Sequence, residues 1–361
     1  MQRLLLLVGT RKGAFIAEGD PARRSDPDAW RFRGPLCEGW PINCFRRNPA
    51  TGTLYAGGAS PWYGAAVWRS DDLGDTWTHS SVGLTYGDDG PAMRSVWQVL
   101  PAHGALYAGV EPAGLFRSLD GGVTWSHVEG LTSHPSRPTW APGNGGLICH
   151  TILAHPADPA RMWVGISAVG CFATEDGGAT WEARNTGVRA DYLPDPYPET
   201  GLCVHKMVLA SGMPERLYQQ NHCGQYRSDD AGRTWTSIEA GLPSSFGFPL
   251  VAHPRDPDTV FTIPLNGAEQ GRFVPDARAA VWRSTDRGTT WTALRNGLPQ
   301  SNAHVGVLRD AMATDGLEPF GLYFGTSTGQ LYASADEGRE WRRVGDLLPP
   351  IHSVATALVE D

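Results

Sequence analysis

The sequence predicts an all-β fold built from repeated four-stranded antiparallel units, and three observations support this prediction. The 361 residues include 44 glycines, 28 prolines and 14 tryptophans, which is typical of many short strands joined by tight turns. An eight-residue motif recurs along the chain at intervals of roughly fifty residues. Short apolar segments of strand length fill the intervals between its copies. We therefore expect residues 1–361 to form one repeat array, a single domain.

The repeated motif reads Ser-x-Asp-x-Gly-x-Thr-Trp, where x is any residue. Its Asp and Ser side chains can bond the backbone amides of a tight turn, Gly allows a positive φ, and Trp buries a large ring between units. We interpret the motif as a folding device without a chemical role. The six copies begin at Ser70, Ser118, Thr174, Ser228, Ser284 and Ser334, and the last has Glu340 in place of Thr.

The motif resembles the Asp-box, or bacterial neuraminidase repeat, of β-propeller proteins, and the resemblance covers nearly the whole chain. Such families include sialidases, xyloglucan hydrolases, sortilin ectodomains and photosystem assembly factors. The resemblance therefore implies a sialidase-like or glycosyl-hydrolase-like repeat protein, but the shared motif does not choose among activities. A true sialidase is disfavoured. Residues 47–49 (Arg-Asn-Pro) are not the Arg-Ile-Pro motif of sialidases, and Arg11 and Arg94 lack a third arginine placed by the repeat.

The unit pattern predicts seven blades and explains how the ring closes. In the third unit the four strands are expected at 150–155, 162–167, 170–174 and 180–184. Segments 4–10, 13–18 and 30–33 match the second to fourth strands of a unit, and 351–359 matches a first strand. Joined, they complete a seventh blade, so the predicted fold is a β-propeller closed by pairing of the N- and C-terminal strands. The first strands are expected to begin near Ile42, Arg94, His150, His205, Phe248, His304 and His352.

Every irregular insertion is predicted on one face of the ring. Strand alternation places the loops 78–93, 126–148, 182–203 and 266–280 together on that face, whereas the other face carries the short repeated turns. Long loops in a compact domain are usually binding loops or lids. We therefore expect the functional site on the long-loop face, near the axis.

The spacing of the first two strands predicts which side chains ring the axis. If all hairpins share one register, residue i of the first strand faces residue i+17 of the second. This rule predicts a polar arc formed by blades two to four, whereas blades one and five are apolar. The predicted pairs are Ile42 with Ala59, Arg94 with Glu111, His150 with Ser167, His205 with His222, Phe248 with Leu265 and His352 with Arg11, with His304 near Ser327.

The polar arc supplies the candidate catalytic residues Glu111, Arg94, His205 and His222. Glu111 opposite Arg94 is most simply a salt bridge, or else a carboxylate suited to nucleophile or base work. Its acid partner would then come from Asp191, Asp195 or Glu199, since glycoside hydrolysis needs two carboxylates. The candidate ligand-binding residues are Arg11, Trp97, His150, Lys206, Asn221, His304, His352, Tyr192 and Glu199.

The histidines also suggest a metal site. His150, His205 and His222 could share a divalent transition ion with an open position for water or substrate. The alternative is that each histidine only satisfies a strand end. Cys149, Cys203 and Cys223 flank these histidines and are most simply buried fillers, although Cys223 could also act as a ligand or a redox thiol.

Three function classes follow. The first is a glycosyl-hydrolase-like enzyme or sugar binder that takes a small polar ligand at the axial mouth. The second is a metal-dependent enzyme using axial histidines. The third is a non-catalytic platform that binds a protein partner through an apolar rim of Trp40, Trp62, Trp97 and Trp140.

Charge and hydropathy exclude other partners. The net charge of −8 argues against nucleic acid, and no apolar run approaches the ~20 residues that a spanning helix needs. The six cysteines form no CxxC pair, which favours reduced thiols. No signal-peptide pattern is present, so we expect a cytoplasmic location.

Overall fold

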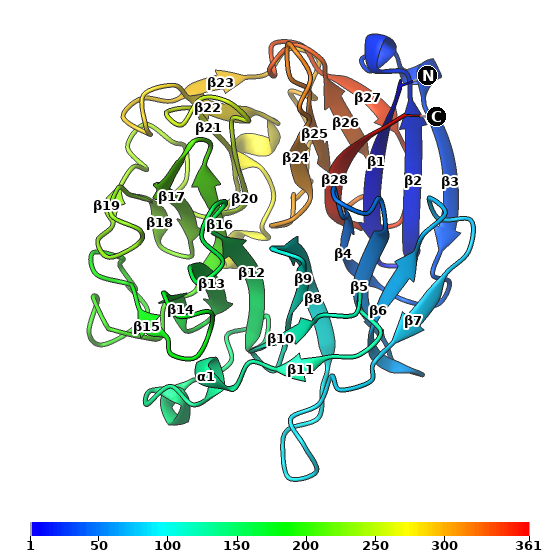
Figure 1. The fold of residues 1–361 in the computed structure, drawn as a ribbon. Coiled ribbons are helices and arrows are strands. Elements are labelled where there is room, and N and C mark those ends of the chain that lie inside the picture. The colour runs from blue at the N-terminus through cyan, green and yellow to red at the C-terminus, as the bar shows by residue number, and fades with distance from the viewer. Residues whose placement is uncertain (1, 361) are drawn as a thin grey trace.

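A computed structural model of the chain, which describes residues 2–360, confirms the seven-bladed β-propeller (Figure 1). Seven four-stranded antiparallel sheets surround a central axis, and each sheet runs from an inner to an outer strand. Blades one to three are β4 (Ile42–Arg47), β5 (Leu54–Ser60), β6 (Gly64–Ser70), β7 (Thr78–Ser80); β8 (Ser95–Ala102), β9 (Ala105–Glu111), β10 (Gly114–Ser118), β11 (Ser126–His127); and β12 (Ile148–Ala154), β13 (Met162–Ser167), β14 (Gly170–Thr174), β15 (Glu182–Ala183).

The remaining four blades follow the same order. Blades four and five are β16 (Val204–Ala210), β17 (Met213–Asn221), β18 (Gly224–Ser228), β19 (Thr236–Ser237); and β20 (Gly247–Ala252), β21 (Val260–Pro264), β22 (Val281–Ser284), β23 (Thr292–Leu294). Blades six and seven are β24 (Met312–Thr314), β25 (Leu322–Gly325), β26 (Leu331–Ser334), β27 (Arg342–Gly345); and β28 (Ile351–Glu360), β1 (Gln2–Thr10), β2 (Gly13–Gly19), β3 (Arg31–Leu36).

Helical structure is confined to short turns. The one α-helix within residues 2–360 is α1 (Glu129–Thr132), and none of the described helices is long and apolar enough to cross a bilayer. All six cysteines are free thiols, in agreement with the prediction. The 3₁₀ turns are η1 (Pro21–Arg23), η2 (Pro27–Ala29), η3 (Arg137–Thr139), η4 (Ala268–Gln270) and η5 (Pro275–Ala277).

The last strand of the chain closes the ring, as predicted. β28 pairs antiparallel with β1 along almost its whole length, from Gln2 opposite Glu360 to Thr10 opposite Ile351. The two ends of the chain consequently lie side by side (Figure 1). Since β1 is paired on both edges, by β28 and β2, the N-terminal strand has no unpaired edge.

The repeated motif forms the predicted turn between the third and fourth strands. In blade three, Thr174 Oγ1 donates to Asp176 Oδ1 at 2.7 Å and accepts from the Gly178 amide at 3.0 Å. The amide and hydroxyl of Thr180 both donate to the Asp176 carboxylate, at 2.9 and 2.6 Å. Gly178 has φ +97°, which favours glycine. The motif side chains therefore hold one another and the turn backbone.

These hydrogen bonds predict an acid-sensitive stability. The hydroxyl and amide of Thr180 lower the pKa of Asp176 from an ordinary 3.8 to about 2, and Thr290 does the same for Asp286. A carboxyl with a lowered folded-state pKa stabilises the fold above its ordinary pKa, and this stabilisation is lost as pH falls towards the folded-state value. We therefore expect the urea midpoint to fall between about pH 4 and about pH 2.

The control for this prediction is a pair of variants at one hydroxyl. Thr180→Val removes the hydroxyl bond to Asp176, so the urea midpoint should depend less steeply on pH below about pH 4. Thr180→Ser keeps the hydroxyl donor and should preserve that dependence. Identical slopes for the two variants would contradict the assignment.

The predicted i to i+17 register is wrong, because each of six inner strands contains a β-bulge. In blade three Ile148, and not His150, pairs with Ser167. In blade four Val204 pairs with Asn221, so that the His222 amide donates to the Cys203 carbonyl at 2.9 Å. The extra residue on the inner strand changes which residues pair with the second strand, while the residues beyond the bulge keep the sheet faces that they would otherwise occupy.

Blade six also departs from the prediction. Its inner strand begins at Met312, not near His304, and the segment before it reaches the neighbouring blade through a bridge between Asp310 and Ser353. His304 is exposed and its ring packs against Phe273. Residues 303–308 therefore form an irregular, partly buried loop and not a strand.

Candidate axial ligand-binding site

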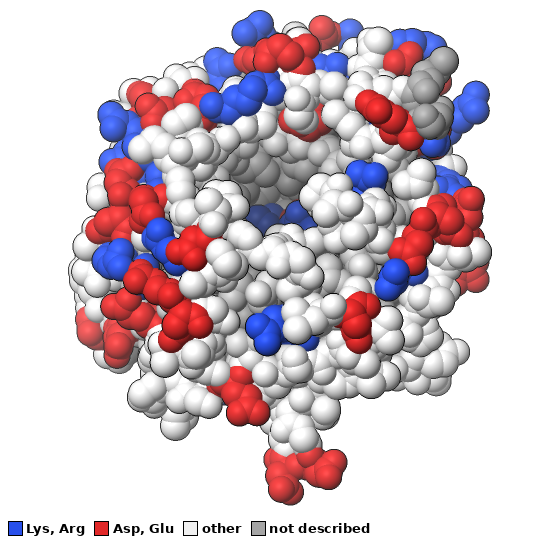
Figure 2. Space-filling model, in the orientation of Figure 1, with Lys and Arg blue, Asp and Glu red and all other residues white. Residues whose placement is uncertain are grey.

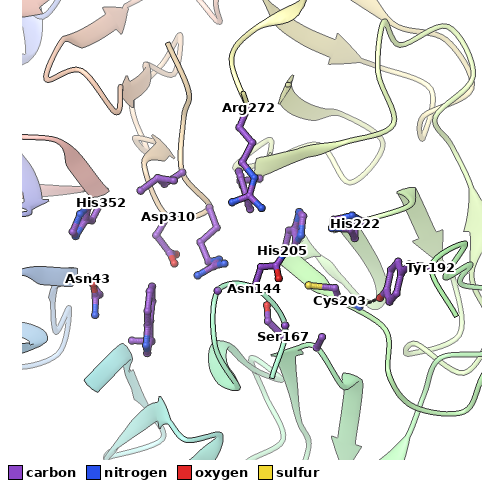
Figure 3. Close-up of a pocket in the computed structure, with 17 residues that line it drawn as sticks. Asn43, Asn144, Ser167, Tyr192, Cys203, His205, His222, Arg272, Asp310 and His352 are labelled. Carbon is purple, nitrogen blue, oxygen red and sulfur yellow. Dashed lines mark hydrogen bonds between the residues drawn. The ribbon is translucent and has the colours of Figure 1, made fainter. Parts of the chain in front are cut away.

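A cavity of about 520 Å³ opens at the axis among the long loops (Figure 3). This volume lies within the range of small-molecule sites. Every blade contributes at least one side chain, and the loops 126–148, 182–203 and 266–280 contribute others. The lining residues are Asn43, Trp97, Gly143, Asn144, Gly145, Ser167, Ala168, Tyr192, Cys203, His205, His222, Phe248, Arg272, Leu308, Arg309, Asp310 and His352.

The bulges of the inner strands aim side chains into this cavity. In five blades the residue at the bulge lines the cavity, because the extra residue turns its side chain out of the regular alternation. Blade three is the exception, since its bulge residue His150 is fully buried and Ser167 lines the cavity instead. The five bulge residues are Asn43, Trp97, His205, Phe248 and His352.

Cys203, His205 and His222 gather on one wall with Tyr192 (Figure 3). The ring centroids of the two histidines are 5.5 Å apart, and Tyr192 lies edge-on to His222 at 5.3 Å. The Tyr192 hydroxyl donates to the Gly201 carbonyl at 3.0 Å and accepts from the Cys203 amide at 2.8 Å. This tyrosine therefore holds the 182–203 loop against the cavity wall.

Two arginines enter the cavity beside Phe248. The Arg309 guanidinium lies 5.3 Å from the Trp97 ring and 5.9 Å from Phe248, and that of Arg272 lies 5.8 Å from both Phe246 and Phe248. Within residues 2–360 neither guanidinium forms a side-chain hydrogen bond or a salt bridge, and burial lowers the pKa of Arg309. Aromatic faces orient both cations and leave their donors open.

A buried ion pair lies next to the cavity. Asp310 accepts from Lys206 and has Arg46 at 3.6 Å and Gln98 at 3.5 Å. Lys206 does not line the cavity, and burial lowers its pKa. One face of the molecule is hollowed at the axis, with basic side chains at the floor of the hollow (Figure 2). Asp310 therefore neutralises the buried Lys206 and the partly exposed Arg46.

Glu111 and Arg94 do not line the cavity, although they were predicted as catalytic residues. Arg94 Nη1 lies 3.6 Å from Glu111 Oε1, which confirms the predicted contact, and the Arg94 side chain is 72% exposed. The other carboxylate oxygen of Glu111 accepts from Trp97 Nε1 at 3.1 Å. Glu111 thus orients the tryptophan that lines the cavity.

His150 does not join His205 and His222, contrary to the predicted metal set. Its Nδ1 meets Thr151 Oγ1 at 3.0 Å, and its Nε2 meets the Val204 carbonyl at 2.9 Å and Ser167 Oγ at 3.1 Å. Both ring nitrogens are therefore satisfied within the protein. The bulge at His205 brings Cys203 opposite His222, so a thiol occupies the third place.

The other predicted residues divide into two groups. Trp97, Tyr192, His205, His222 and His352 line the cavity. The remainder lie elsewhere: Lys206 and Asn221 are buried, and Arg11, His304 and Glu199 are exposed outside the lining.

Sequence reasoning missed Arg309, Arg272 and Asp310. The interval of twelve residues between first and second strands, applied backwards from Leu322, points to Asp310 and its neighbour Arg309. This position competes with His304, from which the first strand of blade six was expected. Arg272 lies in the 266–280 loop, and no pattern in the sequence distinguishes it from the other arginines there.

Comparison with known proteins finds carbohydrate-active relatives. No family model matches the chain. A xyloglucanase of Paenibacillus sp is 30% identical over 262 residues, covering 63% of this chain and 23% of that protein. The xyloglucanase Xgh74A of Acetivibrio thermocellus is 28% identical over 257 residues, covering 63% and 28%. The chain thus spans about a quarter of the length of these curated relatives.

Solved structures agree on the fold. A GH74 enzyme of Niastella koreensis superposes with a TM-score of 0.59 at 16% identity, over 97% of this chain and 51% of that one. YCF48 of Cyanidioschyzon merolae superposes with a TM-score of 0.51 at 14% identity, over 86% of each chain. At these identities the likeness concerns the propeller fold alone.

Proposed function

We propose that this protein is a glycosyl-hydrolase-like propeller whose axial cavity binds a small acidic saccharide. The observation that carries the proposal is the pair Arg272 and Arg309, which flank Phe248 with their hydrogen-bond donors open to the cavity. Arginine is the residue best suited to bind a carboxylate in two-point fashion. The ligand is therefore expected to carry a negative charge.

The rest of the lining suits a sugar ring. Trp97, Tyr192 and Phe248 offer aromatic faces. Asn144 offers a donor and an acceptor for hydroxyl groups, and Asn43 offers its acceptor oxygen, because its amide nitrogen donates to Ser95 and Val96. The buried Nε of Arg309 and Nδ1 of His352 have no hydrogen-bond partner within residues 2–360. Buried polar atoms are rarely left unpaired, so a polar ligand would satisfy them. The xyloglucanase relatives add support for the carbohydrate class.

The size of the cavity argues for a ligand of one or two rings, and its single carboxylate within residues 2–360 argues against two-carboxylate hydrolysis at the axis. Asp310 is the one carboxylate among the described lining residues, and it is held by Lys206 and Arg46. Glu111 lies behind Trp97. A pair of carboxylates on either side of a glycosidic bond is therefore not assembled here.

Calorimetric titration with matched saccharides tests this proposal. A uronic-acid disaccharide should bind, and Arg309→Gln should weaken that binding by about 10- to 100-fold, because a charge-assisted hydrogen bond contributes about 1.5–3 kcal/mol. The neutral disaccharide of the same linkage should bind more weakly and should be little affected by the substitution.

Arg278→Gln is the control, since Arg278 lies in the 266–280 loop with Arg272 but is exposed and outside the lining. It should leave both affinities unchanged. Equal affinity for the acidic and neutral saccharides, or equal losses in the two arginine variants, would contradict the proposal.

A further inference from the structure

We propose that Cys203, His205 and His222 hold one zinc ion on the wall of the axial cavity, with the fourth coordination position open to that cavity. Each residue offers one ligand atom, and these atoms all lie within 4.8 Å of one another. All three side chains line the cavity and point towards one another (Figure 3). This assignment goes beyond saccharide binding and does not depend on it.

His205 is set up as a nitrogen ligand by its partner on blade five. Its Nδ1 lies 2.6 Å from the Gly247 carbonyl oxygen, and a carbonyl can only accept. Nδ1 therefore carries the proton, and Nε2 keeps its lone pair. The ring is stacked on Phe248 at 4.6 Å and meets Phe246 edge-on at 5.2 Å, which fixes its plane. A backbone carbonyl on the far nitrogen is the usual orienting contact of a metal-binding histidine.

His222 also has open ligand atoms, and the position of Cys203 beside it is fixed through its backbone. Within residues 2–360 no group hydrogen-bonds to either ring nitrogen of His222, whose ring is held edge-on by Tyr192 and Phe246 at 5.3 and 5.1 Å. The backbone of Cys203 is fixed by two contacts, its amide to Tyr192 and its carbonyl to the amide of His222. The backbone positions of two ligands are thus fixed by one strand pair.

His150 shows what a purely structural histidine looks like in this protein. It occupies the bulge of blade three, as His205 occupies that of blade four, and both of its ring nitrogens are hydrogen-bonded within the protein. A role limited to satisfying strand ends would leave His205 and His222 in the same condition. Their open nitrogens instead face a cavity, next to a thiol.

The donor set selects the metal. One thiolate and two imidazoles suit zinc and exclude magnesium and calcium, which require oxygen ligands. Ligands bound to tetrahedral zinc lie about 3.3–3.8 Å apart, so small side-chain rotations would close the group around an ion. Three protein ligands with an open fourth position are typical of catalytic zinc sites.

The local charge favours an anion on that open position. Arg272 and Arg309 act electrostatically on Cys203 and His205, and they would oppose a bare divalent ion. A thiolate and an anionic fourth ligand offset this repulsion. Bound zinc should therefore increase the affinity for a carboxylate ligand, and the carboxylate should increase the affinity for zinc.

Metal titration of untagged, chelator-treated protein tests the site without any saccharide. Zinc should bind at one ion per chain, and cobalt should bind at the same stoichiometry with near-ultraviolet thiolate-to-metal absorption. Cys203→Ser should abolish that absorption, and His205→Gln or His222→Gln should weaken zinc binding by more than about 100-fold, since loss of even an orienting contact weakens metal sites by 10–100-fold.

Cys223→Ser and His304→Gln are the controls, a thiol and an imidazole outside the group, and both should retain the absorption and the affinity. Near-ultraviolet circular dichroism of each apo variant separates ligand loss from misfolding. Absence of stoichiometric zinc binding, or absorption lost equally in Cys223→Ser, would overturn the proposal. Arg309→Gln should keep the metal, so failure of saccharide binding and failure of the metal site remain distinguishable.

Discussion

Removal of residues 351–361 should leave the protein unable to fold. The deletion removes β28 and leaves the inner edge of β1 unpaired. The side chains of β1 residues Leu4 to Leu7 are buried in the intact ring. It also removes the buried side chains of Ile351, Val354 and Val359 from the interfaces with the neighbouring blades. An unpaired apolar edge promotes association between chains. Size-exclusion chromatography and near-ultraviolet circular dichroism should show aggregated protein without a cooperative melting transition.

A relocation variant is the matched control for this deletion. Placing residues 349–360 ahead of residue 2 through a short hairpin loop keeps the same strand but joins it to β1 as the first two strands are joined in the other blades. This variant should recover a cooperative transition. A truncated protein that melts cooperatively at the temperature of the intact chain would show that β28 is dispensable.

Asp310→Ala should destabilise the protein by about 3–5 kcal/mol, because it leaves the buried Lys206 without a counter-charge. Arg46 and Arg309 lie close by and add repulsion. Urea denaturation at neutral pH measures the loss. Burial lowers the pKa of Lys206, so the folded variant sheds this proton more readily than the unfolded chain, and the loss should shrink as pH rises towards the lysine's ordinary 10.5.

Two comparisons separate this effect from general damage. Adding Lys206→Met to Asp310→Ala removes the stranded charge and should recover most of the stability. Glu215→Ala breaks a more exposed pair with Arg161, and it should lose no more than about 1 kcal/mol. If Asp310→Ala lowers the free energy of unfolding no more than Glu215→Ala does, the pair of Asp310 and Lys206 does not stabilise the fold as proposed.

The fold was predictable from the sequence because its determinants are local and repeated. Each copy of the turn motif is complete within eight residues, as the hydrogen bonds of Asp176 show. Closure by 351–359 followed from counting strands, since one end lacked an inner strand and the other end had one. These signals survive small errors in register.

The site was only partly predictable, because it depends on the bulges. A uniform pairing rule placed His205 opposite His222, but one extra residue in β16 makes Cys203 the partner of His222. The same rule expected Arg94 on the axis, whereas the tighter hairpin of blade two puts Trp97 at the bulge. Arg272 reaches the cavity from a loop whose path no periodicity describes.

The bulges also separate the chemistry of this protein from its architecture. Asn43, Trp97, His205, Phe248 and His352 each occupy an inner-strand position that takes no part in the regular pairing of its blade. A substitution there changes what the cavity offers to a ligand while the ladder on either side keeps its partners. Such positions can diverge independently of one another, so related chains could acquire different specificities by exchanging a handful of side chains. A library that varies Asn43, Trp97 and His352 together would explore new ligands on an unaltered ring.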